Sequence, residues 1–175
     1  MAIAAGQQES SVGIGGAAGN DEVQVVEFLI GEDKFAVNLF DVREIVEASK
    51  ITPLPHASSY IRGIIDLRGE ITTIVDLRHL LRIKKAGDNN SEDLRFIVLD
   101  ESVTDGKTGV VVDEVTSVLT VAVADIDQNS HGAGDESYIL GVIKKEVGER
   151  GESKKELVIW IDICGLIKQA GGISQ

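Results

Sequence analysis

The sequence predicts an all-β fold built from two copies of one unit, each a small closed barrel of five strands. The first observation is internal repetition, because Ser59–Ile65 reappears as Ser137–Ile143 with five of seven residues identical. Self-similarity at a long offset indicates two copies of one structural unit. The second observation is composition. Aromatic residues make up only 4% of the chain, so the core is expected to consist of Val, Ile and Leu, which favours sheet over helix. Two further pairs of segments repeat in the same order: Phe40–Val46 with Asp113–Leu119, and Thr73–Leu81 with Ile159–Ile167.

The chain is expected to divide into a tail and two barrel subdomains. Residues 1–22 are rich in Gly, Ala, Ser and Gln, which is typical of a disordered segment. Residues 23–93 form the first expected subdomain, which ends in a polar linker. Residues 94–170 form the second, with a short C-terminal helix. Whether strands are exchanged between the two barrels stays open.

Alternating apolar residues between turn signals give the expected elements in order. In the first copy the strands are 23–30, 34–39, 44–52, 62–67 and 71–76, with turns at 31–33 and 68–70 and one helical turn at 77–81. In the second copy the strands are 94–99, 108–112, 115–123, 138–143 and 157–161, with a charged loop at 144–156 and a helix at 162–170. Five short strands are too few for an open sandwich and suit a closed barrel, which leaves no exposed edge.

Composition excludes several classes of partner. The net charge of −12 argues against nucleic acid, whose phosphates require a basic patch, and against an anionic membrane surface. No apolar stretch approaches the ~20 residues needed to cross a bilayer, so no membrane insertion is expected. The single cysteine, Cys164, cannot form an internal disulfide, and no signal peptide is visible. The sequence therefore predicts a soluble cytoplasmic protein.

Neither a catalytic site nor a cofactor or metal site is predicted. The three histidines lie far apart, and no carboxylate is paired with a base in an acid–base pattern. Cys164 lies in an apolar segment and is expected to be a packed thiol. The Gly13-x-Gly15-x-x-Ala18 segment follows polar residues rather than a buried strand, which argues against nucleotide binding.

An alternative function is calcium or small-ligand binding by the segment Asp125–Glu136. Asp125, Asp127, Asn129 and Glu136 occupy positions 1, 3, 5 and 12 of a calcium loop. Position 6, which needs glycine for its sharp turn, is Ser130. No amphipathic helices flank the segment, so a solvated acidic loop is the simpler interpretation.

Two arginines distinguish the first copy from the second. Arg62 is replaced by Leu140 in the repeat, and Arg68 lies in a turn where the second copy has the long charged segment. Arg62 and Arg68 are six positions apart, so regular alternation would place both on one face of a strand. A guanidinium beside a carboxylate forms directed hydrogen bonds. Two interpretations fit this pattern: a surface salt bridge, and a protein-binding site in which a polar spot lies beside exposed apolar residues.

The segment around these arginines resembles the chemotaxis coupling proteins, the CheW family. The resemblance rests on Tyr60–Ile71, read YIRGIIDLRGEI, and on Thr73–Arg78, read TIVDLR. Phe28–Val37, Val42–Ile45 and Gly109–Val115 resemble the family as well, and the similarity covers about residues 23–168.

The resemblance implies a fold of two five-stranded SH3-like barrels packed side by side. It also implies a non-catalytic adaptor that joins the cytoplasmic tips of chemoreceptors, the methyl-accepting chemotaxis proteins, to the regulatory domain of the histidine kinase CheA. Such a protein would work at membrane-associated receptor arrays without a cofactor. The receptor-binding residues that it implies are Val42, Glu44, Arg62 and Arg68, and the Glu44 and Arg68 side chains are expected to interact with each other.

Overall fold

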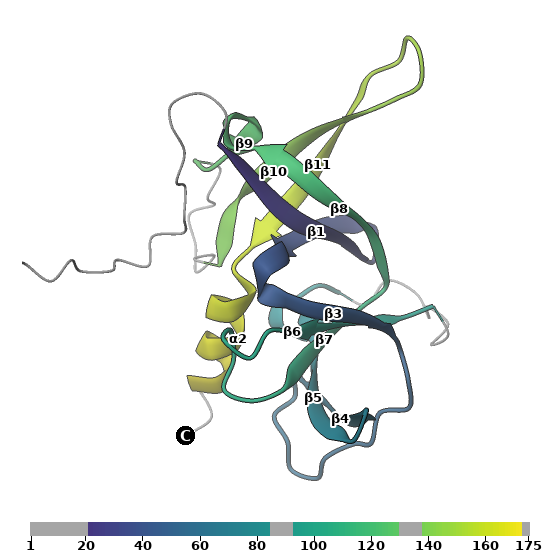
Figure 1. Cartoon of the computed structure of the whole chain (residues 1–175), viewed down its shortest axis with the longest axis vertical. Coiled ribbons are helices and arrows are strands. Elements are labelled where there is room, and N and C mark those ends of the chain that lie inside the picture. Colours follow the sequence, from purple (N-terminus) through teal and green to yellow (C-terminus); the bar gives the residue numbers. More distant parts are fainter. Residues whose placement is uncertain (1–20, 85–92, 130–137, 173–175) are drawn as a thin grey trace, which may run out of the picture.

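The computed structural model describes residues 21–84, 93–129 and 138–172 and consists mostly of strands (Figure 1). The strands are β1 (Glu22–Ile30), β2 (Asp33–Asn38), β3 (Val42–Glu47), β4 (Ile61–Leu67), β5 (Glu70–Asp76), β6 (Arg95–Leu99), β7 (Thr108–Val112), β8 (Glu114–Ala122), β9 (Ile126–Asp127), β10 (Ile139–Val147) and β11 (Lys154–Ile161). The helices are η1 (Leu39–Asp41), α1 (Leu77–Leu80), η2 (Val123–Asp125) and α2 (Ile163–Gly172). The all-β fold class with a short C-terminal helix is confirmed. The expected tail, residues 1–22, lies almost wholly outside the described residues.

The strands form two sheets that do not follow the two halves of the chain. One sheet has the order β3-β6-β7-β5-β4 and is called the first barrel; the other has the order β8-β1-β2-β11-β10-β9 and is called the second barrel. The hairpin β1–β2 therefore joins strands from the C-terminal half. The chain crosses between barrels twice, after β2 and after β7, and the boundary expected between residues 93 and 94 falls inside the first barrel. The sixth strand of the second barrel is the two-residue β9.

The repeat in the sequence corresponds to a repeat in geometry. Both β4 and β10 carry a register shift at a glycine, Gly63 in one and Gly141 in the other. The strand that follows ends in each case on a backbone hydrogen bond of 2.7 Å, from Asp76 N–H to the Tyr60 carbonyl and from Asp162 N–H to the Tyr138 carbonyl. Both aspartates then accept hydrogen bonds at the start of a helix.

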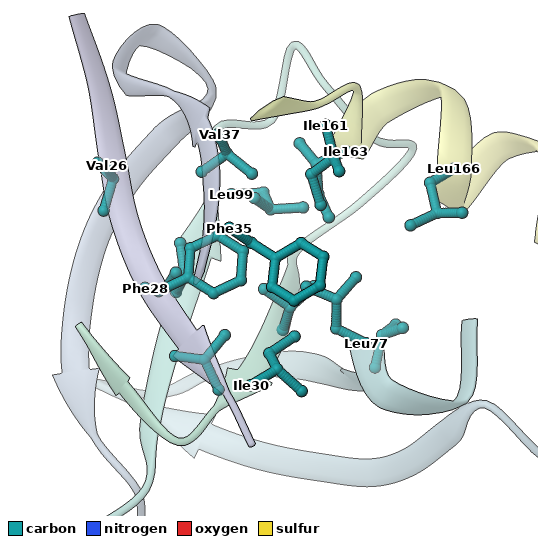
Figure 2. Close-up of a cluster of buried hydrophobic side chains, with 14 of the residues drawn as sticks. Val26, Phe28, Ile30, Phe35, Val37, Leu77, Leu99, Ile161, Ile163 and Leu166 are labelled. Atoms are coloured by element: carbon teal, nitrogen blue, oxygen red, sulfur yellow. The ribbon is translucent and has the colours of Figure 1, made fainter. Parts of the chain in front are cut away.

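Three hydrophobic clusters hold the fold together, and the largest lies between the barrels rather than inside either. Figure 2 shows this inter-barrel core, to which both sheets and α2 contribute. The rings of Phe28 and Phe35 stack within it, with centroids 6.0 Å apart. All five residues of β7 are buried, because one face of this strand meets the first barrel's own core and the other meets the inter-barrel core. The two barrels are thus packed as one body.

The expected charged loop at 144–156 is wrong, because most of it is strand. β10 and β11 continue to pair as far as Val147 and Lys154, and the hairpin projects from the second barrel (Figure 1). Lys145 faces Glu156 and Glu146 faces Lys155, and opposite charges directly across a ladder stabilise it. At its base, Lys145 Nζ lies 3.4 Å from the buried carboxylate of Glu27. Charged residues on a two-sided exposed hairpin resemble a loop in sequence.

Candidate functional site

Glu44 and Arg68 form an ion pair that connects the two edges of the first barrel. Glu44 lies on β3, the first strand of the sheet order, and Arg68 follows β4, the last. Arg68 Nη2 is 2.8 Å from Glu44 Oε2, and Nη1 donates to Oε1 at 3.3 Å. The guanidinium therefore binds the carboxylate with two of its nitrogens, a geometry that fixes direction as well as distance. The sequence-based expectation that these two side chains interact agrees with this contact.

The backbone presents Arg68 at the tip of a tight turn. Leu67 pairs with Glu70, so Arg68 and Gly69 are the two turn residues, with φ of +54° and +83°. Two successive positive φ values define the hairpin turn whose twist matches that of the strands. Gly69 N–H donates to Asp66 Oδ1 at 2.7 Å and holds the turn. The Arg68 side chain is 73% exposed and that of Glu44 is 23% exposed, so the pair offers its cationic side to a partner.

Arg62 lies apart from this pair. Its Nη1 is 3.4 Å from Asp76 Oδ2, near the start of α1 and at the opposite end of the β4–β5 hairpin from the turn. The expected placement of Arg62 and Arg68 on one strand face is wrong for two reasons. The register shift between Ile61 and Gly63 interrupts the alternation, and the strand ends at Leu67.

Val42 lies two residues before Glu44 on β3, where it is half-buried and packs against the inter-barrel core. The residue after Glu44, Ile45, is 39% exposed. This edge of the first barrel therefore combines an apolar rim at the junction of the barrels with the oriented Glu44–Arg68 pair. The structure brings together Val42, Glu44 and Arg68, and it does not bring Arg62 to them.

Sequence reasoning did not single out the ionic residues beside this edge. Arg43 Nη1 lies 2.9 Å from Glu101 Oε1, and Lys107 Nζ lies 3.7 Å from the same carboxylate oxygen and contacts Glu70. The hydrogen bond from Lys107 holds the pKa of the Glu70 carboxyl below its ordinary value. These residues come from β3, β5 and the β6–β7 connection, so no local sequence pattern could have grouped them.

The alternative calcium segment is only partly described, since Ser130, His131 and Glu136 lie outside the described residues. Within the described part, Asp127 Oδ2 lies 3.7 Å from Lys144 Nζ, and Asp127 Oδ1 accepts a hydrogen bond from Asn129 N–H. The Lys144 ammonium thus already pairs with one of the carboxylates that a calcium ion would need. Across residues 21–84, 93–129 and 138–172, no group of three metal-ligating side chains is gathered. Cys164 is half-buried, and its thiol donates to the Val103 carbonyl.

Two barrel-like sheets around a shared core, with an oriented ion pair exposed at one edge, fit the class of scaffold proteins that act through protein contacts. The chain belongs to the CheW-like domain family, whose family model matches residues 24–171. It is accordingly a chemotaxis scaffold protein.

Individual relatives agree with this assignment. The chain is 31% identical to the chemotaxis protein CheW of Treponema pallidum (strain Nichols) over 134 residues, which cover 74% of this chain and 77% of that protein. It is 34% identical to the CheW of Rhizobium meliloti (strain 1021) over 125 residues, or 70% and 78% of the two chains. Among solved structures it is similar to the scaffolding protein TtCheW from Thermoanaerobacter tengcongensis, with a TM-score of 0.67 and 28% identity over 82% of this chain and 91% of that one. Of the helices described, none is long and apolar enough to cross a membrane.

Proposed function

We propose that this protein is an adaptor that couples the cytoplasmic tips of chemoreceptors to the histidine kinase CheA, and that it does so at membrane-associated receptor arrays in the cytoplasm. The observation that carries the receptor part is the Glu44–Arg68 pair, which is oriented by two hydrogen bonds and yet exposed on its cationic side. An ion pair serving stability alone gains little from such exposure.

The receptor contact would use the edge formed by Val42, Glu44 and Arg68. Apolar side chains of a receptor helix would pack on Val42, at the rim of the inter-barrel core, and on the exposed Ile45. The polar pair would set the register of that helix, because an oriented guanidinium donates hydrogen bonds in only a few directions. Arg62 would form a separate contact, since its partner Asp76 places it at the other end of the hairpin.

The kinase contact would be made by the regulatory domain of CheA against a barrel end that the receptor leaves free. Because the inter-barrel core joins both barrels, a receptor bound at one edge and a kinase bound elsewhere would be held on the same molecule. Each interface can be small and weak on its own, since many copies in an array supply avidity.

The test is binding of the purified protein to a receptor cytoplasmic fragment and, separately, to the CheA regulatory domain. We expect Arg68→Ala and Glu44→Ala to weaken receptor binding at least ~10-fold, the size expected for a residue central to an interface. Arg43→Ala is the matched control, because it also removes an ion-paired arginine, which lies on the same strand as Glu44 and has a different partner, Glu101. Kinase binding is expected to stay unchanged in all three variants. Binding of the folded protein to neither partner would overturn the proposal.

A further inference from the structure

The two crossings of the chain between barrels are built differently, although they occupy equivalent places in the repeat. In the first barrel β5 lies parallel to β7, with Thr73 beside Thr108, and in the second β11 lies parallel to β2, with Ile159 beside Phe35. Five residues beyond each of these pairs, β5 or β11 has led into a helix, and β7 or β2 has led into the crossing to the other barrel. The residues at these positions are Arg78 and Asp113 in one case, and Cys164 and Phe40 in the other.

The crossing after β7 is fastened by a largely buried ion pair. Arg78 on α1 contacts the Asp113 carboxylate through Nη2, and the two side chains are 18% and 10% exposed. The same carboxylate oxygen accepts the backbone N–H of Gly31 at 2.5 Å, and Asp113 N–H donates to the Leu29 carbonyl at 3.0 Å. Arg78 lies just beyond a first-barrel strand, whereas Leu29 and Gly31 belong to the β1–β2 hairpin of the second barrel. One carboxylate thus connects both barrels and the crossing itself.

The crossing after β2 has no such fastening at the equivalent positions. Cys164 stands where Arg78 would be, and its thiol donates to the Val103 carbonyl. Phe40 stands where Asp113 would be, and it is 78% exposed. The neighbouring Asp41 is close to like charges, since burial and then the Asp162 and Asp100 carboxylates raise the pKa of Asp41.

We infer that Arg78 is a positioning residue that fixes the orientation of the two barrels by clamping the β7–β8 crossing to the β1–β2 turn through Asp113. The barrels already share an apolar core, but apolar contacts are not directional. A guanidinium–carboxylate pair is directional, and it is strongest where water is excluded. Without the clamp, the core holds the barrels together while their relative angle spreads.

This role deepens the proposed function, on which its consequence for signalling rests. An adaptor that carries a receptor on one surface and a kinase on another transmits receptor motion only if the angle between those surfaces is defined. Loss of the clamp would leave each binding reaction intact and would reduce receptor control of the kinase.

The experiment measures the distance between barrels directly, by double electron–electron resonance of two spin labels in a Cys164→Ser background. Labels at Glu47 on β3 and Thr120 on β8, both exposed, report on the inter-barrel distance. Labels at Thr120 and Lys144, both on the second barrel, report on a distance that the clamp does not set. Arg78→Gln is expected to broaden the first distance distribution and to leave the second unchanged. Arg43→Gln, which breaks an exposed ion pair within the first barrel, is the matched control and is expected to change neither.

Asp113→Asn provides a second, milder variant, because its side-chain oxygen can still accept the Gly31 N–H while the charge that Arg78 needs is gone. It is expected to broaden the same inter-barrel distribution. A wild-type distribution in either clamp variant overturns the inference, and so does equal broadening of both distances, which would show general loosening of the fold. The measurement needs neither receptor nor kinase, so its failure and a failure of the adaptor proposal are distinguishable.

Discussion

Gly63→Ala is the substitution for which the structure predicts the largest loss of stability among the glycines that mark the repeat. Gly63 has φ of +144°, and a Cβ at this position would lie 2.2 Å from the Thr52 carbonyl oxygen and 2.7 Å from Ile51 Cγ2. Thr52 cannot retreat without cost, because it exchanges two backbone hydrogen bonds of 2.8 and 2.9 Å with Ile64. Backbone strain contributes about 1–3 kcal/mol, and overpacking contributes about the same again.

A total loss of ~2–6 kcal/mol is a large part of the ~5–15 kcal/mol by which a typical domain is stable. For a chain of this size the melting temperature should therefore fall by at least about 5 °C. Thermal and urea unfolding followed by circular dichroism would measure the change.

Gly106→Ala is the control for this prediction. Gly106 has φ of +103°, but a Cβ added there would meet nothing within 4 Å, so only backbone strain of about 1 kcal/mol is expected. Gly141→Ala should fall between the two, since the backbone there is not in the left-handed region and the shortest contact would be with the Ile126 Cγ2 methyl at 2.7 Å, with the Asp127 carbonyl oxygen farther away at 3.1 Å. If Gly63→Ala costs no more than Gly106→Ala, the close approach of Thr52 is not what requires a glycine.

Three further outcomes are expected. Arg68→Ala and Glu44→Ala should each lower the free energy of unfolding by no more than about 1 kcal/mol, because the Arg68 side chain is 73% exposed; a collapse of the fold would show that the pair is structural. Asp41→Asn should raise the melting temperature at neutral pH. The folded state raises the pKa of Asp41, so the stability linked to its protonation is present below the ordinary pKa of aspartate and is lost as the pH rises through the raised value. The gain from the substitution should accordingly shrink as the pH is lowered toward ~4, and a gain independent of pH would contradict this cause. Calorimetric titration with Ca²⁺ should give no binding heat, because Lys144 neutralises Asp127 in the Asp125–Glu136 segment; saturable heat would revive the calcium alternative.

The sequence predicted most strands, because their alternation and turn residues are local signals. The turn at Arg68-Gly69 and the helical turn at Leu77 follow from such signals. The length of the β10–β11 hairpin could not be predicted from local signals. Lys145 and Glu156 are recognised as a pair only when the two strands are placed opposite each other. Glu27 is a similar case, because a carboxylate that is 1% exposed in a strand is explained only by Thr116, Lys34 and Lys145, which contact it from other strands.

The candidate site was predicted in part, and through the family resemblance rather than through alternation. The Glu44–Arg68 contact joins residues from opposite edges of a sheet, so no spacing rule could have given it. The alternation argument for Arg62 and Arg68 failed because the ladder shifts its register around Arg62 and because Arg68 lies in the turn beyond Leu67, where strand alternation no longer applies. The assignment of strands to barrels was also beyond local patterns, since the buried residues of β7 face two different cores.

The order of strands bears on how the chain can fold during synthesis. The first barrel is contiguous, from β3 to β7, whereas the second needs β1 and β2 together with β8 to β11. The leading hairpin therefore leaves the ribosome before the strands with which it pairs. The first barrel can cover its Phe28 and Phe35 face, but the other face, with Val25 and Ala36, packs against residues of β8 to β11 and lacks these partners until they have followed. A fragment spanning 42–112 contains every strand of one sheet, while cutting the gene at its midpoint would leave both products without a complete one.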